Sequence, residues 1–227
     1  MNPYAIILAG GHGLRAGTDT PKQFLRLNGK MVIQYSLEAF KEALPGCKII
    51  LVASALHRHY WEPLLQNTPG FADVQVTDSG TERFFSVRNG LVKIPGNVLV
   101  GIHDAARPLI SVDLIRTTYR LAADHGCCIP AITPADSIRL LTEKTSLPLP
   151  RNTIRLVQTP QVFLSSELKT AYQAPYNDLF TDDAAVWENA GLSVFLCEGR
   201  KHNFKITTPD DIPLAGWLLS SNGSPKG

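Results

Sequence analysis

The 227-residue sequence contains no apolar run that approaches the roughly 18 residues needed for a membrane-spanning helix. Its first residues, Met1 to Tyr4, lack the basic segment and the apolar stretch of a secretory signal peptide. The four cysteines form neither a C-x-x-C motif nor a zinc-binding spacing: they are Cys47, Cys127, Cys128 and Cys197. We therefore expect a cytoplasmic protein without membrane contact, whose cysteines are buried free thiols in a reducing compartment.

The sequence also has little excess charge of either sign. Its 22 basic and 20 acidic side chains leave a formal net charge of only +2. Binding of nucleic acid over a broad surface requires a concentrated basic excess, so this balance argues against a nucleic-acid partner. A local anion site remains compatible with it. With 44% hydrophobic and 19% charged residues, the composition is typical of a globular domain.

Short apolar runs alternate with longer segments of helical periodicity, which is typical of βα units around a mostly parallel sheet. The predicted strands are Tyr4–Ala9, Lys48–Ala53, Val98–His103, Cys127–Ala131 and Ser193–Cys197. The predicted helices are Val32–Ala43, Arg83–Leu91, Val112–Asp124, Ser166–Gln173, Asp182–Ala190 and Pro209–Leu219. The pattern thus predicts one α/β domain over residues 1–219, followed by a flexible tail at 220–227.

Some helix ends can be predicted from local sequence. Ser111 is placed to cap the helix that follows it, and Gly191 to end the helix before it. Thr181 precedes two acids that suit the positive N-terminus of a helix. Thr208 followed by Pro209 predicts a cap and a first helical position.

The segment at about residues 136–158 breaks the alternation of strands and helices. It contains Pro148 and Pro150, with alternating apolar residues such as Ile138 and Leu140, and no long helical period. This pattern predicts a β-arm that projects from the main domain. Because an isolated two-stranded ribbon is only marginally stable, pairing with a second subunit would account for the arm.

The segment after the first predicted strand is rich in glycine and carries two cations. It reads Ala9-Gly10-Gly11-His12-Gly13-Leu14-Arg15, and Pro21-Lys22-Gln23 comes shortly after it. Glycines directly after a strand let the backbone approach a ligand and present its N–H groups to anionic oxygens. Arg15 offers a planar fork to phosphate oxygens, and Lys22 a compact point charge.

Three interpretations of this glycine-rich loop are open. A tight turn without a ligand explains the glycines but not the two cations. Gly11-x-Gly13-x-x-Ala16 fits a dinucleotide-binding motif, but Pro21 interrupts the helix that the motif requires and no acid ends the second strand. A nucleotidyltransferase loop is favoured, because transfer at the α-phosphorus of a nucleoside triphosphate needs fixed positive charge and N–H dipoles around the phosphates.

Further stretches make a resemblance to a known family specific. They are Pro21-Lys22-Gln23-Phe24, His103–Pro108, Gln158–Gln161, Phe180–Ala184 and Asn203–Pro209. In this order they resemble the methylerythritol phosphate cytidylyltransferase family over nearly the whole chain. The resemblance implies a Rossmann-like fold, a homodimer joined by the β-arm, and dependence on a divalent cation, usually Mg²⁺. The implied reaction joins CTP to 2-C-methyl-D-erythritol 4-phosphate and releases pyrophosphate, in non-mevalonate isoprenoid biosynthesis.

The resemblance also implies a role for individual residues. The implied catalytic residues are Arg15, Lys22, Arg151 and Lys205. Ala9, Gly10, Gly11, Gly13, Gly80, Ser86 and Asp104 are implied in CTP binding. The acceptor phosphate and its alcohol would contact Asp104, Arg107, Ser137, Arg151, Thr159 and Thr181, with Arg151 and Thr159 reaching across the dimer. Asp104 would also hold the metal ion among the phosphates.

Several of these residues have a structural alternative. For Asp104 the alternative is an ion pair with Arg107, for Lys205 an exposed surface position, and for Thr181 a purely capping role. His103 is expected to be structural because it ends a buried strand. No general base is expected, since a phosphate monoester with a second pKa near 6 is largely ionised at pH 7.

Two other functions compete with the favoured one. A ribitol 5-phosphate cytidylyltransferase resembles the chain over the same length, although Asp104-Ala105-Ala106-Arg107 leans towards methylerythritol phosphate. A nucleotide-sugar sensor without catalysis is a second alternative. The presence of Arg15, Lys22, Asp104 and Lys205 together argues against it, because a sensor has no need to stabilise a leaving pyrophosphate. The chain departs from the family pattern at Ala16, Thr81, Ser137 and Pro150, of which Thr81 and Pro150 bear on the cytosine contacts and the arm.

Overall fold

The computed structural model describes residues 2–11 and 20–221. Its centre is an eight-stranded sheet in the order β10-β7-β11-β6-β1-β4-β5, with β12 paired to β7. The strands are β1 (Tyr4–Leu8), β4 (Lys48–Ala53), β5 (Gln75–Asp78), β6 (Leu99–Asp104), β7 (Cys127–Ile132), β10 (Leu156–Val157), β11 (Gln161–Leu164) and β12 (Leu196–Glu198). β10 and β11 run antiparallel to their neighbours, and the remaining pairs are parallel. The predicted α/β architecture with a mostly parallel sheet is confirmed.

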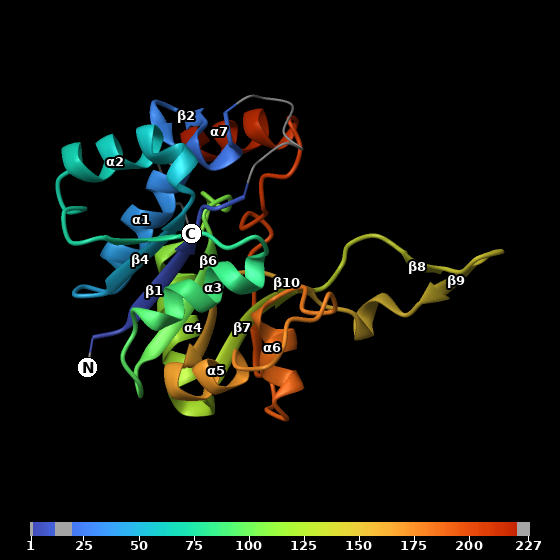
Figure 1. Ribbon diagram of the computed structural model, residues 1–227. Helices are drawn as coiled ribbons and strands as arrows, with labels where there is room; N and C mark the ends of the chain where they lie inside the picture. Colours follow the sequence, from blue (N-terminus) through green and yellow to red (C-terminus); the bar gives the residue numbers. More distant parts are fainter. Residues whose placement is uncertain (1, 12–19, 222–227) are drawn as a thin grey trace.

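Helices cover both faces of this sheet (Figure 1). They are α1 (Val32–Ala43), α2 (Arg58–Asn67), α3 (Arg83–Val92), α4 (Val112–His125), α5 (Ser165–Ala171), α6 (Asp183–Asn189) and α7 (Asp211–Ser221). No helix of the described residues combines the length and the apolar character needed to cross a membrane.

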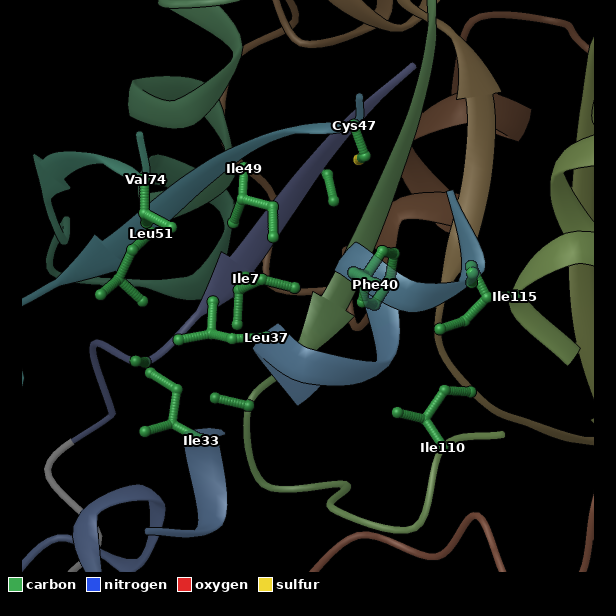
Figure 2. Packing of buried hydrophobic residues seen from close by; sticks show 14 of the residues in the cluster. Ile7, Ile33, Leu37, Phe40, Cys47, Ile49, Leu51, Val74, Ile110 and Ile115 are labelled. Carbon is green, nitrogen blue, oxygen red and sulfur yellow. The ribbon is translucent and has the colours of Figure 1, made fainter. Parts of the chain in front are cut away.

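Strand alternation divides the core between the two faces. On β1, Ile7 packs with side chains of α1, α2 and α4, whereas its neighbour Ile6 packs with those of α3, α5 and α6. Figure 2 shows the first of these clusters, in which Leu37 and Phe40 of α1 lie against the sheet. Because successive strand residues point to opposite faces, an unbroken apolar run such as that of β1 serves a sheet covered on both sides.

The helix ends agree with the sequence in some places and differ in others. The hydroxyl of Ser111 caps α4 by accepting the N–H of Leu114 at 3.2 Å, as predicted. The predicted cap at Thr208 is wrong: α7 begins at Asp211, whose carboxylate accepts the N–H groups of Thr207 and Thr208 at 2.7 and 2.8 Å. α7 continues through Ser221, two residues beyond its predicted end, and residues 222–227 lie outside the described part of the chain.

The arm segment forms a hairpin of its own. β8 (Ile138–Leu141) pairs antiparallel with β9 (Ser146–Leu149) in a separate two-stranded sheet. The hairpin extends away from the main sheet (Figure 1), and Leu140, Leu141 and Leu147 are at least half exposed. Exposure of these apolar side chains to water is unfavourable, so the surface of the hairpin is suited to contact with a partner.

Three of the four cysteines are buried, and Cys197 is half-buried; all four are free thiols, as the sequence predicts. Burial raises the pKa of the Cys47 thiol to about 12, so this thiol stays protonated and unreactive.

Candidate active site

A cleft of about 560 Å³ opens at the carboxyl ends of β1 and β6. Its lining combines the loops after both strands with the segment before α3 and the segment before α7: Leu8, Gly10, Gly11, Lys22, Gln23, Gly80, Thr81, Glu82, Arg83, Ser86, Asp104, Ala106, Lys205 and Thr207. In open α/β sheets this edge is where ligands bind. The structure thus brings together seven of the predicted site residues, namely Gly10, Gly11, Lys22, Gly80, Ser86, Asp104 and Lys205.

Gln23 holds the described start of the glycine-rich loop in place. Its side-chain amide donates to the carbonyl oxygens of Ala9 at 2.7 Å and Gly11 at 2.8 Å, and the side chain is buried. A side chain at Gly10 would not fit, since a Cβ atom there would lie 2.2 Å from the Cβ of Ser79. Gln23 was not among the predicted site residues. Gly13 and Arg15 lie outside the described residues, so their roles remain predictions.

Gly80 and Ser86 form the opposite wall of the cleft. The N–H of Gly80 donates to Ser86 Oγ at 3.0 Å, and the Ser86 hydroxyl donates to the carbonyl of Glu82 at 3.1 Å. A Cβ atom on Gly80 would lie 2.3 Å from that of Phe85. The two predicted residues therefore shape the turn that leads into α3, whose N-terminal end faces the cleft.

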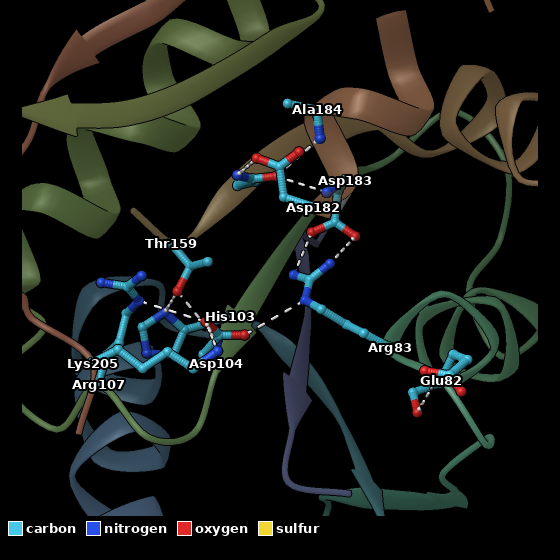
Figure 3. Close-up of polar contacts among 12 residues, drawn as sticks. Glu82, Arg83, His103, Asp104, Arg107, Thr159, Asp182, Asp183, Ala184 and Lys205 are labelled. Carbon is cyan, nitrogen blue, oxygen red and sulfur yellow. Dashed lines mark hydrogen bonds and ion pairs between the residues drawn. The ribbon is translucent and has the colours of Figure 1, made fainter. Parts of the chain in front are cut away.

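Asp104 lies in the middle of a cluster of cations (Figure 3). Its carboxylate is 3.0 Å from the ammonium of Lys205, 3.6 Å from Nε of Arg107 and 3.7 Å from Nε of Arg83. Burial alone would raise the pKa of Asp104, but the three cations, Lys205 foremost, hold it well below its ordinary value. The ionised carboxylate thus offers fixed oxygens at the floor of a positively charged cleft.

Arg107 lies beside this carboxylate but is turned away from the cleft. Its Nη1 donates to the carbonyl of Asn203 at 2.7 Å, and only 12% of its side chain is exposed. This bond ties the Arg107 turn to the segment that carries Lys205. The alternative of an ion pair with Asp104 is thus realised, and Lys205 shares the same carboxylate.

Arg83 is fixed by a second acid, Asp183, for which the sequence predicts only a place at a helix terminus. Its Nη1 and Nη2 donate to the two carboxylate oxygens of Asp183 at 2.9 and 2.7 Å. The fully buried Asp183 also accepts the Tyr172 hydroxyl at 2.6 Å. The side chain of Gln161 accepts the N–H groups of Asp183 and Ala184, both at 3.1 Å, which holds the first turn of α6.

His103 is fully buried beneath the cleft. Burial lowers the pKa of this imidazole to about 3, so it is neutral at physiological pH. Ser36 and Thr159 lie at hydrogen-bonding distance from its two ring nitrogens. This environment agrees with the structural role expected for it.

Of the six predicted acceptor contacts, all but Asp104 lie outside the lining of this cleft. Ser137 and Arg151 are exposed at the base of the hairpin, where Arg151 donates to the carbonyl of Ala135 at 2.6 Å. Thr181 is exposed beside α6. Its capping alternative is wrong, because the cap is Asp182, which accepts the N–H of Ala185 at 2.9 Å. Thr159 is buried behind Asp104 in the same protomer.

Comparison with known proteins identifies the family of this chain. The sequence profile of 2-C-methyl-D-erythritol 4-phosphate cytidylyltransferase matches residues 4–221. The chain belongs to this family. The cytidylyltransferase of that name from Phocaeicola vulgatus is 43% identical over 219 residues, which cover 96% of this chain and 100% of the relative.

Solved structures agree with this assignment. The 4-diphosphocytidyl-2C-methyl-D-erythritol synthase of Anaerococcus prevotii superposes with a TM-score of 0.83 over 96% of this chain and 98% of its own, and at 24% identity it supports the fold. The 2-C-methyl-D-erythritol 4-phosphate cytidylyltransferase of Francisella tularensis is 31% identical, with a TM-score of 0.79 over 96% of this chain and 100% of its own. The Rossmann-like fold implied by the resemblance is confirmed.

Proposed function

We propose that this chain transfers the cytidylyl group of CTP to 2-C-methyl-D-erythritol 4-phosphate. The products are 4-CDP-2-C-methyl-D-erythritol and pyrophosphate. The observation that carries the proposal is the cleft in which Lys22, Lys205 and the glycine-rich loop surround Asp104, in a chain of this family. The relatives bear the methylerythritol name, which favours that acceptor over ribitol 5-phosphate.

The reaction is an in-line displacement at the α-phosphorus of CTP. An oxygen of the acceptor phosphate forms a bond to this phosphorus, and the bond from phosphorus to the bridging oxygen of pyrophosphate breaks. Negative charge grows on the departing pyrophosphate, where Lys22 and Lys205 provide fixed positive charge from the cleft walls. Arg15 is proposed to share this task. The acceptor phosphate is largely ionised at pH 7 and needs no general base.

Mg²⁺ is the proposed metal ion, and Asp104 the residue that would hold it. The described residues contain no cluster of three or more histidine, cysteine or acidic side chains suited to a metal. A single ionised carboxylate at the floor of the cleft fits Mg²⁺, which binds through one or two carboxylates and completes its shell with substrate phosphates and water. Bound there, the ion would neutralise phosphate charge.

A homodimer joined through the hairpin of β8 and β9 is part of the proposal. It is supported by the exposed Leu140, Leu141 and Leu147, which a partner subunit would cover. Ser137 and Arg151 at the base of the hairpin lie outside the lining of their own cleft. We infer that they serve the acceptor site of the neighbouring subunit.

A pyrophosphate-release assay tests the function. Purified protein would be offered CTP, UTP or ATP, each with methylerythritol phosphate or ribitol 5-phosphate, in the presence of Mg²⁺. We expect turnover with CTP and methylerythritol phosphate. Turnover with ribitol 5-phosphate alone would overturn the acceptor, and absence of turnover with every pair would overturn the proposal in favour of a non-catalytic binding protein.

A further inference from the structure

A chain of buried hydrogen bonds runs beneath the turn that carries Asp104. The N–H of Asp104 donates to Thr159 Oγ1 at 3.2 Å, and this oxygen lies 3.0 Å from Nδ1 of His103. On the other side of the ring, Nε2 lies 3.3 Å from Ser36 Oγ, which donates to the carbonyl of Arg107 at 3.5 Å. Ser36, His103 and Thr159 are at most 4% exposed. This hydrogen-bond chain therefore begins and ends on the backbone of the same turn.

The direction of each bond in this chain can be deduced. The Ser36 hydroxyl donates its single proton to the carbonyl of Arg107, so towards His103 it can only accept, and Nε2 must carry the proton. A neutral imidazole carries one proton, so Nδ1 is unprotonated and accepts the proton of Thr159 Oγ1, which itself accepts the Asp104 N–H. Nε2–H donates to Ser36, whose hydroxyl proton continues to Arg107. Every donor in the chain is thus matched to one acceptor.

The turn itself closes with a bond from the N–H of Arg107 to the carbonyl of Asp104 at 3.1 Å. The cations around the Asp104 carboxylate stabilise its charge, but Coulomb attraction from three sides imposes little direction on the group. Hydrogen bonds are directional and weaken steeply when bent. Beside the backbone bonds from Ala105 N–H to Leu8 and from Ile206 N–H to Ala106, at 3.1 and 2.9 Å, the hydrogen-bond chain therefore adds a direction to this turn that the ion pairs do not supply.

We propose that Ser36, His103 and Thr159 act together as positioning residues, which fix the Asp104–Arg107 turn through a single order of donors with His103 in its Nε2–H tautomer. The three residues come from α1, from β6 and from the segment before β11, so the hydrogen-bond chain also ties α1 and the segment before β11 to the end of β6. None of them lines the cleft. The inference rests on the proposed role of Asp104 in the reaction.

The tautomer can be measured without any substrate. Two-bond nitrogen–proton correlation spectra of the ¹⁵N-labelled full-length protein at neutral pH would report which ring nitrogen of each of its 6 histidines is protonated. The His103 signals are those missing from the spectrum of a His103→Asn variant. We expect the Nε2–H form alone. A protonated Nδ1 would overturn the proposal whatever the enzyme's activity, whereas an inactive wild type would overturn only the proposed function.

Matched substitutions test the consequence for catalysis. Thr159→Val removes the hydroxyl at nearly constant volume, and Thr159→Ser retains it. Because misplacement of a site by about 1 Å costs on the order of 10²-fold in rate, we expect Thr159→Val to lower kcat by about 10- to 100-fold. The KM for CTP should stay within about twofold, and Thr159→Ser should recover most of kcat. Wild-type kcat in Thr159→Val, or a loss confined to KM, would contradict the positioning role.

A double-mutant cycle asks whether the chain acts as a unit. Ser36 and Thr159 contact opposite nitrogens of His103, so Ser36→Ala and Thr159→Val remove its two ends. If the hydrogen-bond chain acts as one unit, the second substitution should lower kcat much less in the variant that already carries the first than it does in the wild type. Fully additive losses, in variants whose thermal unfolding confirms that they fold, would show that the two hydroxyls act separately.

Discussion

The carboxylate of Asp183 and the guanidinium of Arg83, 100 residues apart in the sequence, meet in two parallel hydrogen bonds of 2.9 and 2.7 Å. Such a bidentate pair has a defined geometry as well as a charge. It ties the first turn of α6 to the first turn of α3, and the same guanidinium lies 3.7 Å from Asp104. The pair therefore connects a buried structural acid to the floor of the cleft.

Substitution of Asp183 by Asn should destabilise the protein. Removing one partner of a buried ion pair leaves the other charge without compensation, and we expect a loss of about 2–4 kcal/mol in the free energy of unfolding. Urea unfolding with an unchanged m-value would measure it. The exposed Glu188 on the same helix provides the control, and Glu188→Gln should change stability by less than about 0.5 kcal/mol. Equal effects of the two substitutions would contradict this account of the pair.

The Asp104 carboxylate predicts a dependence of stability on pH. Its pKa is depressed in the folded state, so its contribution is present above the unfolded pKa of roughly 4 and is lost as the pH falls through the folded pKa. Below about pH 4 the free energy of unfolding of the wild type should therefore fall more steeply than that of Asp104→Asn. Urea unfolding at a series of pH values would show this, and parallel profiles would count against the cation cluster as its cause.

Gln23 should be needed for the geometry of the glycine-rich loop. Gln23→Leu keeps a similar size but leaves the carbonyls of Ala9 and Gly11 without their side-chain donor. We expect kcat/KM for CTP to fall by about 10-fold or more, because the loop no longer presents its N–H groups to the phosphates. Gln34→Leu on α1, which is not part of the cleft lining, is the matched control. A normal kcat/KM in Gln23→Leu would show that the loop holds its shape without this side chain.

Sharing of sites across a dimer can be tested by mixing variants. Subunits with Arg151→Ala and subunits with Lys22→Ala should each be nearly inactive alone. If Arg151 serves the neighbouring cleft, a heterodimer contains one site with both defects and one site with neither. We therefore expect part of the wild-type turnover to return. No recovery in verified heterodimers would place Arg151 in the cleft of its own subunit.

The sequence predicts those parts of the fold that depend on local pattern. The apolar runs of β1, β4 and β7 and the periodic segment of α1 carry their own signals, and the structure has them with bounds that differ by at most one residue. α2 was missed because Pro63 lies inside it, and β5 because its half-polar run Gln75–Asp78 resembles a loop. β11 was missed because its four residues follow Pro160 directly, and nothing in the sequence signals an antiparallel strand between β6 and β7.

The residues of the candidate site likewise include some that could be predicted from the sequence and some that could not. Gly10 and Lys22 could be predicted from the loop itself, because glycines directly after a strand suit close backbone approach and a nearby lysine suits phosphate. Gly80 and Asp104 could be predicted through the resemblance to the family. Gln23 could have been found, since a polar residue that follows the loop lysine is a ready donor for loop carbonyls. Asp183 as the partner of Arg83 could not, because their contact depends on how α3 and α6 pack on the same face of the sheet.

Formation of the product tests the central claim most directly. ³¹P NMR would follow CTP and methylerythritol phosphate with Mg²⁺ in the presence of the wild type, of Lys22→Ala, and of Lys30→Ala, whose lysine is exposed and paired with Glu38. We predict a diphosphate diester and pyrophosphate in equal amounts from the wild type and Lys30→Ala, and a rate on the order of 10²-fold lower from Lys22→Ala. Equal rates in Lys22→Ala and the wild type, or no diester from the wild type, would contradict the account.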